Sequence, residues 1–199
     1  GLATAACLIL SGCTNAADWN ANRSSQIHSY DTSSIQAQPD IIAKLPQGAL
    51  DDGVLDVAAS TDYAPAEFLD PSGKAVGYDV DLTNAIAAVL GVKGKVHTAE
   101  FDSIIASIGS KYDAGISSFT VTPERTAEVD MTAYINVGSR FNVQAGNPKE
   151  VDTSDHLRLC GRTIGVQVGT GQETTMRKAA ENCASAGKDV LSVRSYSKQ

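Results

Sequence analysis

The sequence has little positive charge and no long apolar run, and these shortages exclude several classes of protein. Of its 199 residues, 16 are Lys or Arg and 23 are Asp or Glu, which gives a net charge of -7. Such a chain lacks the basic surface that binds nucleic acids or anionic lipids, so we expect no nucleic-acid partner. No stretch contains the roughly eighteen consecutive apolar residues that a membrane-spanning helix needs.

Patterns that bind metals or cofactors are also missing. The three histidines (His28, His97 and His156) are scattered, and the sequence has neither a CxxC nor an HxxxH spacing. Zinc sites need such clustered ligands. The GxG at 169–171 is not a dinucleotide-binding fingerprint, because Thr174 occupies the position of the third glycine. We therefore expect no metal and no cofactor.

The composition is that of a globular protein, with 42% hydrophobic and 20% charged residues. The length of 199 residues is sufficient for one large domain or two small lobes. After residue 53, strand-like and helix-like segments alternate, which favours an α/β fold with a mostly parallel sheet covered by helices. The expected strands are 54–60, 95–100 and 112–119, and the expected helices between them are 78–91 and 101–110.

Acidic residues near the starts of these helices are candidate caps. Asp79 or Asp81 is expected to cap the first helix, which should end at Gly91, and Asp102 is expected to cap the second. Each carboxylate would accept backbone N–H groups that have no partner inside the helix. These caps would fix where the two helices begin.

A second block of the same kind follows a polar stretch marked by glycine and proline, so we place a boundary between two lobes near Gly146. Thr170 and Glu173 have the spacing of a capping box at the start of its helix. Two strands and one helix do not complete a sheet covered on both faces, so we expect this chain to contain only part of the second lobe. The block consists of expected strands 162–169 and 189–195 and an expected helix 170–187.

An apolar segment at the N-terminus ends in Leu-Ser-Gly-Cys at residues 10–13. This ending resembles a bacterial lipobox, in which the leader is cut before a cysteine that receives a diacylglyceryl group. We expect 1–12 to be a signal-peptide remnant, Cys13 to be lipidated and the polar stretch 13–38 to include a flexible tether. The alternative is the start of an ordinary apolar helix.

The four cysteines then divide into two groups. Cys7 and Cys13 lie in the N-terminal segment, which leaves Cys160 and Cys183 in the folded part. An exported chain lives in an oxidising compartment, so we expect these two to form a disulfide. Two buried free thiols are the alternative.

The segment GISSFTVTPERTAEVD at 115–130 places a cation at an unusual position. Thr122 is expected to cap a short helix, and Arg125 then stands in its first turn. A cation there is unfavourable by up to about 1 kcal/mol unless an anion compensates. Either the guanidinium binds an anion, or it points to solvent or pairs with a nearby carboxylate. The nearby carboxylates are Glu124, Glu128 and Asp130.

Three longer stretches resemble successive signatures of the bacterial family 3 extracellular solute-binding proteins, the amino-acid receptors of ABC importers. They are DYAPAEFLDPSGKAVGYDVDLTNAIAAVLGV, EFDSIIASIGSKYDAGISSFTVTPER and LCGRTIGVQVGTGQE. The likeness runs from about Leu45 to the end, and the paired cysteines and SSFTVTPER are similar to members from actinobacteria. It implies a two-lobed periplasmic-binding-protein type 2 clamp, with lobe 1 at 39–142, part of lobe 2 at 143–199 and a hinge near Gly138 to Gly146.

The resemblance also implies which residues bind the ligand. Arg125 would hold the α-carboxylate of an amino acid as a bidentate pair, and Thr120 would contact the same group. Ser118 would help to receive the α-ammonium group. From the second lobe, Thr170 would reach the carboxylate when the clamp closes, and Gly171 stands where a hydroxyl residue is frequent in the family.

Other positions concern the side chain of the ligand. Tyr63 and Phe101 match the aromatic walls of the family site, although each could equally be core. The family often has an acidic residue at the end of the first strand, where Ser60 stands here and Asp62 is out of register. The acid that pairs with the α-ammonium comes from a distal part of lobe 2 that this sequence does not include.

The implied function is that of a monomeric receptor which is anchored to the outer face of the cell membrane through lipid on Cys13. It would bind an amino acid and present it to ABC permease subunits, and it would not be an enzyme. One alternative is a periplasmic dehydratase of the cyclohexadienyl or arogenate type, for which Glu67 and Glu100 are the available acids, both expected to be exposed. Another is a sensory lipoprotein without a transport role.

Overall fold

The computed structural model describes residues 29–198. The expected signal-peptide remnant 1–12 and Cys13 lie outside the described residues, as does the first part of the expected tether. In chain order, the elements are α2 (Pro39–Ile42), β1 (Val54–Ala59), β2 (Asp62–Tyr63), β3 (Glu67–Leu69), β4 (Ala75–Val76), α3 (Tyr78–Val89), β5 (Lys93–Thr98), α4 (Phe101–Ser107), β6 (Ala114–Gly115), α5 (Pro123–Thr126), the 3-10 helix η1 (His156–Leu159), β7 (Thr163–Gln167), α6 (Gly171–Ser185) and β8 (Ser192–Tyr196).

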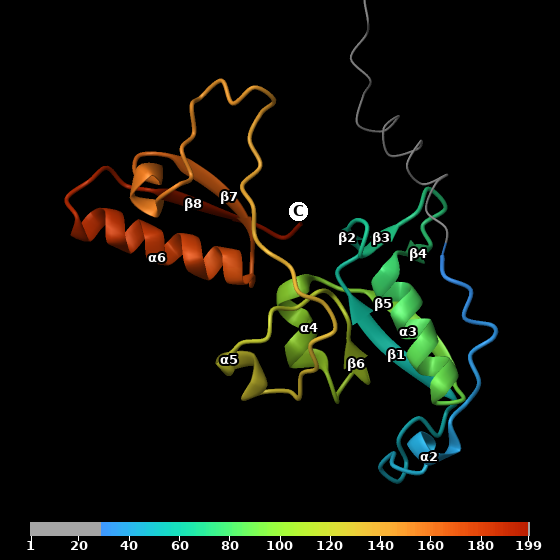
Figure 1. Ribbon diagram of the computed structural model, residues 1–199. Coiled ribbons are helices and arrows are strands. Elements are labelled where there is room, and N and C mark those ends of the chain that lie inside the picture. The colour runs from blue at the N-terminus through green and yellow to red at the C-terminus, as the bar shows by residue number, and fades with distance from the viewer. Residues whose placement is uncertain (1–28, 199) are drawn as a thin grey trace, which may run out of the picture.

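These elements form two bodies that are joined by a long segment without helix or strand (Figure 1). We call the part from β1 to α5 the first lobe and the part from η1 to β8 the second lobe. The joining segment runs from the end of α5 to η1 and includes the expected hinge between Gly138 and Gly146. That it works as a hinge stays a prediction.

In the first lobe, β1 lies at the centre of a parallel sheet between β5 and β6. Successive residues of a strand point to opposite faces of the sheet. Accordingly, Val57 packs with Ala87 of α3, whereas Ala58 packs with Ile104 of α4. The expected alternation of strands and helices is confirmed, although β6 is much shorter than the expected strand 112–119.

A small antiparallel sheet of β2, β3 and β4, which the sequence analysis does not predict, determines how α3 begins. The N–H groups of Tyr78 and Asp79 donate to the carbonyl oxygens of Pro65 and Ala66, so the helix start is capped by backbone. Gly77 allows this contact, because it has a φ of 121° and an added Cβ would lie 2.2 Å from the Ala66 oxygen. Asp79 is therefore not a cap, and its side chain is buried instead.

Two other acidic residues were also expected as caps, and both expectations are wrong. Asp81 lies inside α3, and its carboxylate accepts a backbone N–H from the segment before α2. Asp102 is the second residue of α4, whose cap position is occupied by Glu100 without a side-chain hydrogen bond. By contrast, Thr122 of α5 and Thr170 of α6 are confirmed as caps, because each hydroxyl accepts a backbone N–H from three residues ahead.

The second lobe consists of the parallel strands β7 and β8 with α6 packed against them. The expected disulfide between Cys160 and Cys183 is confirmed, and it ties the end of η1 to α6. Cys183 is fully buried, so the bond lies at the centre of this lobe. The core consists of Leu159, Met176, Ala179, Cys183 and Leu191.

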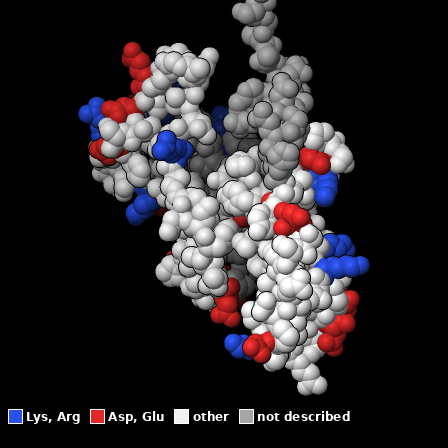
Figure 2. Space-filling model, turned by 45° about the vertical axis from the view of Figure 1, so that its right-hand side comes forward, with Lys and Arg blue, Asp and Glu red and all other residues white. Residues whose placement is uncertain are grey.

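The surface of the described part carries mixed charge. On the face in Figure 2, basic and acidic side chains are interspersed and lie mainly near the edges. Within residues 29–198, no helix has both the length and the apolar character to cross a membrane. The same residues include no group of His, Cys, Asp and Glu that could hold a metal ion.

Reduction of the Cys160–Cys183 disulfide should lower the free energy of unfolding of the second lobe by about 3 kcal/mol, because the bond closes a loop between residues 23 apart. Urea unfolding with and without dithiothreitol measures the difference. The double variant Cys160→Ala/Cys183→Ala serves as the control, since its stability should not respond to the reductant. An identical urea midpoint for the oxidised and reduced protein would contradict this role.

Candidate functional site

A cleft between the two lobes lies at the carboxyl ends of β1, β6 and β7, where loops lead into helices. This is where open α/β sheets usually bind ligands. All six residues expected to contact a ligand line it, namely Tyr63, Phe101, Ser118, Thr120, Arg125 and Thr170. The other lining residues are Ser60, Glu67, Ser117, Val137, Gly138, Gln167, Gly171 and Gln172.

Arg125 connects the two lobes across this cleft. Its guanidinium donates to the carbonyl oxygen of Thr120 at 2.7 Å and to that of Gly169, in the second lobe, at 2.8 Å. The same group lies over the rings of Phe101 and Phe119, at 5.6 and 5.3 Å from their centroids. Cation–π contacts of this kind favour a positive charge at this place.

No carboxylate within residues 29–198 lies at ion-pair distance from Arg125. The interpretation of Arg125 as paired with Glu124, Glu128 or Asp130 is therefore wrong, and the guanidinium, which is partly exposed, bonds to backbone carbonyls. Burial lowers the pKa of the guanidinium, but arginine remains charged at any physiological pH. The cleft thus contains a half-buried cation whose protein partners are neutral carbonyl groups and aromatic rings.

The N-terminus of α6 faces the same cleft. The Thr170 hydroxyl accepts the N–H of Glu173 at 3.2 Å and donates its proton to the carbonyl of Gln167 at 2.7 Å, so it can offer only a lone pair to a ligand. In a capping box, the Glu173 carboxylate would accept the N–H of Thr170. Here it accepts the N–H of Gly169, one residue earlier, so only half of the expected capping box is formed. In the described chain, the N–H groups of Gly171 and Gln172 have no protein acceptor. Such free donors at a helix start attract anions.

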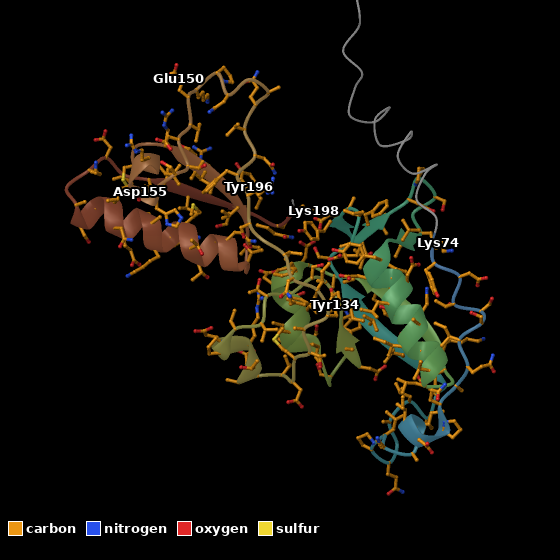
Figure 3. All side chains as sticks on the ribbon, viewed as in Figure 1. Lys74, Tyr134, Glu150, Asp155, Tyr196 and Lys198 are labelled. Atoms are coloured by element: carbon orange, nitrogen blue, oxygen red, sulfur yellow. A yellow bond between two sulfur atoms is a disulfide. The ribbon has the colours of Figure 1, made fainter. Side chains whose placement is uncertain are left out.

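Ser118 is held by a buried acid beneath the cleft. Its N–H and its hydroxyl both donate to Asp79 at 3.1 Å, and its φ of 50° lies in the left-handed region. The hydroxyl of Tyr134 donates to the same carboxylate at 2.8 Å, and burial raises the pKa of this phenol (Tyr134 is labelled near the centre of the molecule in Figure 3). Since the Ser118 hydroxyl gives its proton to Asp79, it can offer only its oxygen to a ligand.

Glu67 is 1% exposed, so the expectation that it lies on the surface is wrong. One oxygen, Oε1, accepts the hydroxyl of Ser117 at 2.6 Å, and the carboxyl also has a side-chain hydrogen bond with Asp79. The pKa of Glu67 is raised to about 9, chiefly by burial; the hydroxyl of Ser117 opposes this rise, and the charge of Asp79 and a side-chain hydrogen bond with Asp79 add to it. At neutral pH this carboxyl therefore holds a proton.

The remaining lining residues give the cleft apolar walls and a polar floor. Phe101 stacks on Phe119 with ring centroids 4.5 Å apart, and Tyr63 lies at the rim, 37% exposed. Ser60 is buried, and its N–H donates to the Ser117 hydroxyl at 2.9 Å. Asp62 does not line the cleft, which agrees with the expectation that it is out of register.

The sequence analysis did not assign Asp79, Tyr134, Gln167 and Gln172 to the site. A signal was available for Asp79, because Asp79, Thr83 and Ala87 recur at helical spacing and all three are buried. Its position near the start of the expected helix 78–91 favoured the interpretation as a cap instead. Tyr134 and the two glutamines reach the site through tertiary packing, and no local pattern predicts this.

Comparison with known proteins finds similarity over most of the chain. The sequence profile of the bacterial extracellular solute-binding proteins, family 3, matches residues 55–193. The arginine-binding protein ArgT of Corynebacterium glutamicum is 29% identical over 160 residues, which cover 79% of this chain and 52% of that protein. The chain thus spans about half the length of this relative.

Two solved structures are also similar. One is the ancestral amino acid-binding protein AncCDT-1, a precursor of cyclohexadienyl dehydratase, with a TM-score of 0.65 and 28% identity, covering 74% of this chain and 62% of that chain. The other is an ancestral arginine-binding protein bound to arginine, with a TM-score of 0.61 and 32% identity, covering 73% and 62%. Both structures therefore share sequence as well as fold with this chain.

Glu67→Gln should make the protein more stable than wild type by an amount that grows with pH. Because the pKa of folded Glu67 is raised, the folded state retains a proton that the unfolded state loses, so the wild-type free energy of unfolding falls by up to about 1.4 kcal/mol per pH unit between about pH 5 and about pH 9. Glutamine does not titrate and removes this contribution.

Urea unfolding of both proteins across that pH range measures the difference, and other titrating groups cancel in the comparison. Glu128→Gln, at an exposed glutamate away from the cleft, is the matched control and should follow wild type. Parallel curves for Glu67→Gln and wild type would show that Glu67 is ionised in the folded protein.

Proposed function

The chain belongs to the bacterial extracellular solute-binding proteins of family 3, and on this premise we propose that it binds a free amino acid between its two lobes and delivers it to an ABC importer. The fold is the α/β fold of type 2 periplasmic binding proteins. The described part of the second lobe has two strands and one covering α-helix. Ligand, transport partner and attachment to the membrane belong to the proposal.

The observation that carries the proposal is the unpaired cation in the cleft. Arg125 is half-buried without a carboxylate partner in the described chain, and it lies close to Gly169, just before the free N–H donors of Gly171 and Gln172. A guanidinium and a helix N-terminus together suit a carboxylate, which can accept from both. In this proposal the α-carboxylate of the ligand binds Arg125 and Thr120 from one lobe and the start of α6 from the other.

The rest of the ligand would extend from this point into the cleft. Ser118 presents an oxygen acceptor near Arg125, which suits the α-ammonium group. Tyr63 and Phe101 would flank the side chain of the ligand. L-arginine is the first ligand to test, because the matched relative from Corynebacterium glutamicum is named as arginine-binding.

Contacts between the lobes support a clamp that closes on the ligand. Besides Arg125 and Gly169, the side-chain amide of Gln167 donates to the Ser60 hydroxyl at 3.4 Å, and Gln172 donates to the hydroxyl of Ser139 in the joining segment at 2.8 Å. A ligand that adds contacts to both lobes would favour the closed form. In the proposal, the segment between Gly138 and Gly146 acts as the hinge, and permease subunits recognise the closed form.

The proposal includes lipid attachment at Cys13 on the outer face of the cell membrane. It depends on the lipobox-like ending of the N-terminal segment, and more than one acyl chain would anchor the domain stably. Metabolic labelling with palmitate in a bacterial host tests it. Label that persists in Cys13→Ser would contradict the assignment.

A second candidate function is a dehydratase, and one observation favours it. Glu67 holds a proton at neutral pH within the cleft, as a general acid must. A solved relative is described as the precursor of cyclohexadienyl dehydratase. Turnover of arogenate or prephenate that is lost in Glu67→Gln would favour this function over simple binding.

Arg125→Ala should weaken amino-acid binding by about 2 to 5 kcal/mol, because it leaves a buried carboxylate without its partner. Calorimetric titration with L-arginine and the other standard amino acids measures this. Arg158→Ala is the matched control, since Arg158 is exposed, pairs with Asp152 and does not line the cleft. Equal affinities of Arg125→Ala and wild type would remove Arg125 from the site.

A further inference from the structure

Gly169 of the second lobe touches the first lobe in two ways. Its carbonyl oxygen accepts the Arg125 guanidinium at 2.8 Å. Its backbone also lies directly against Asp102, the second residue of α4, because a Cβ added to Gly169 would lie 2.7 Å from the Asp102 Cβ and 3.1 Å from its Cα. Both distances are well inside ordinary carbon–carbon contact. A side chain at residue 169 would therefore push the two lobes apart.

The conformation of Gly169 is set by its surroundings. Its φ of 75° lies in the left-handed region, which glycine adopts about as readily as the right-handed one. On either side the chain is anchored within the second lobe. The N–H of Val168 donates to the carbonyl of Tyr196 in β8 at 2.9 Å, and Thr170 caps α6. Gly169 itself needs a further contact to hold its own N–H.

Glu173 provides this contact. Its Oε2 accepts the N–H of Gly169 at 2.8 Å, while its Oε1 accepts from Arg177 at 2.6 Å and from the Ser195 hydroxyl at 2.5 Å. The side chain of Glu173 is only 12% exposed. The bonds from Ser195 and Arg177 hold the pKa of this carboxyl below its usual range, so it is ionised at neutral pH. Gly169 is thus held by a carboxylate that is itself fixed on both oxygens.

The Gly169 carbonyl in turn orients Arg125. A guanidinium has five N–H donors. In the described chain, one donor on each terminal nitrogen is used by the carbonyls of Thr120 and Gly169, so the other three remain for a ligand. Two carbonyls on different nitrogens fix the plane of the group. Gly169 can contribute to this only while the two lobes are together.

We propose that Glu173 is a positioning residue that acts through Gly169, holding it where its carbonyl orients Arg125 and its bare backbone lets the lobes close. The inference rests on the proposed function and goes beyond it, because Glu173 does not line the cleft. The apparent affinity of a protein falls with the fraction of its binding-competent state. Loosening Gly169 should therefore weaken ligand binding although no ligand contact is removed.

Variants of Glu173 test the role by calorimetric titration with L-arginine and then with each other standard amino acid. Glu173→Ala should bind at least about tenfold more weakly than wild type, because the closed fraction falls. Glu173→Gln should stay within about threefold of wild type, since its amide oxygen can still accept the Gly169 N–H. Glu181→Ala is the matched control on the same helix, because Glu181 is exposed and pairs with Lys178, and it should bind as wild type.

The contact with Asp102 is tested separately. Gly169→Ala should also bind at least about tenfold more weakly, because its Cβ meets Asp102. Gly187→Ala is the matched control, since Gly187 has a φ of 63° but nothing within 4 Å of an added Cβ. Adding Asp102→Gly to Gly169→Ala removes the closer contact and should restore most of the affinity. Backbone strain in the second lobe alone would not be rescued in this way.

The guanidinium of Arg125 gives a readout that needs no ligand. In nitrogen-edited proton NMR spectra of the wild-type protein, its terminal N–H protons should give resolved signals, because the two carbonyls restrict rotation of the group. Arg125→Lys identifies these signals. They should merge into one broad signal in Glu173→Ala and stay resolved in Glu173→Gln. Signals that are the same in wild type and Glu173→Ala would overturn the proposal.

The outcomes separate this inference from the function on which it rests. If no amino acid binds to wild type, the proposed function fails, and the NMR comparison still decides the role of Glu173. If an amino acid binds equally well to wild type, Glu173→Ala and Gly169→Ala, only the positioning role is overturned. Circular dichroism shows whether each variant is folded, and the Gly169→Ala rescue decides the question if Glu173→Ala is not.

Discussion

The cleft is organised around one half-buried guanidinium that the described part of the chain leaves without an acid. Arg125 stands in the single turn of α5, and its partners are two backbone carbonyls and two aromatic rings. Because one carbonyl belongs to Gly169 of the second lobe, the charge also ties the lobes together. An anion in the cleft would satisfy the charge and reinforce this link.

A second constraint lies beneath the cleft, where the acids Asp79 and Glu67 are buried close to each other. Asp79 holds Ser118 and Tyr134, and its charge helps to keep Glu67 protonated. This arrangement depends on the backbone contact of Gly77 with Ala66, which caps α3 and leaves Asp79 free to turn inward. The geometry of the cleft thus follows from how a small sheet meets the start of one helix.

Local patterns predicted much of this fold. The strand-helix alternation, the caps Thr122 and Thr170 and the disulfide were all visible in the sequence, because each depends on nearby residues or on few alternatives. Asp79 and Glu67 were misjudged because acids are normally exposed or cap helices, and only tertiary contacts bury them. For the cleft residues, the family resemblance supplied the grouping that spacing alone left undecided.

The central claim is that Arg125 and the start of α6 bind the α-carboxylate of an amino acid. Calorimetric titration of the protein with L-arginine and with its α-amide, L-argininamide, tests this most directly, because the two ligands differ only at that group. The account predicts that the amide binds at least about a hundredfold more weakly, since it cannot form the charge-assisted pair with the guanidinium. Equal affinities for the two ligands would contradict it.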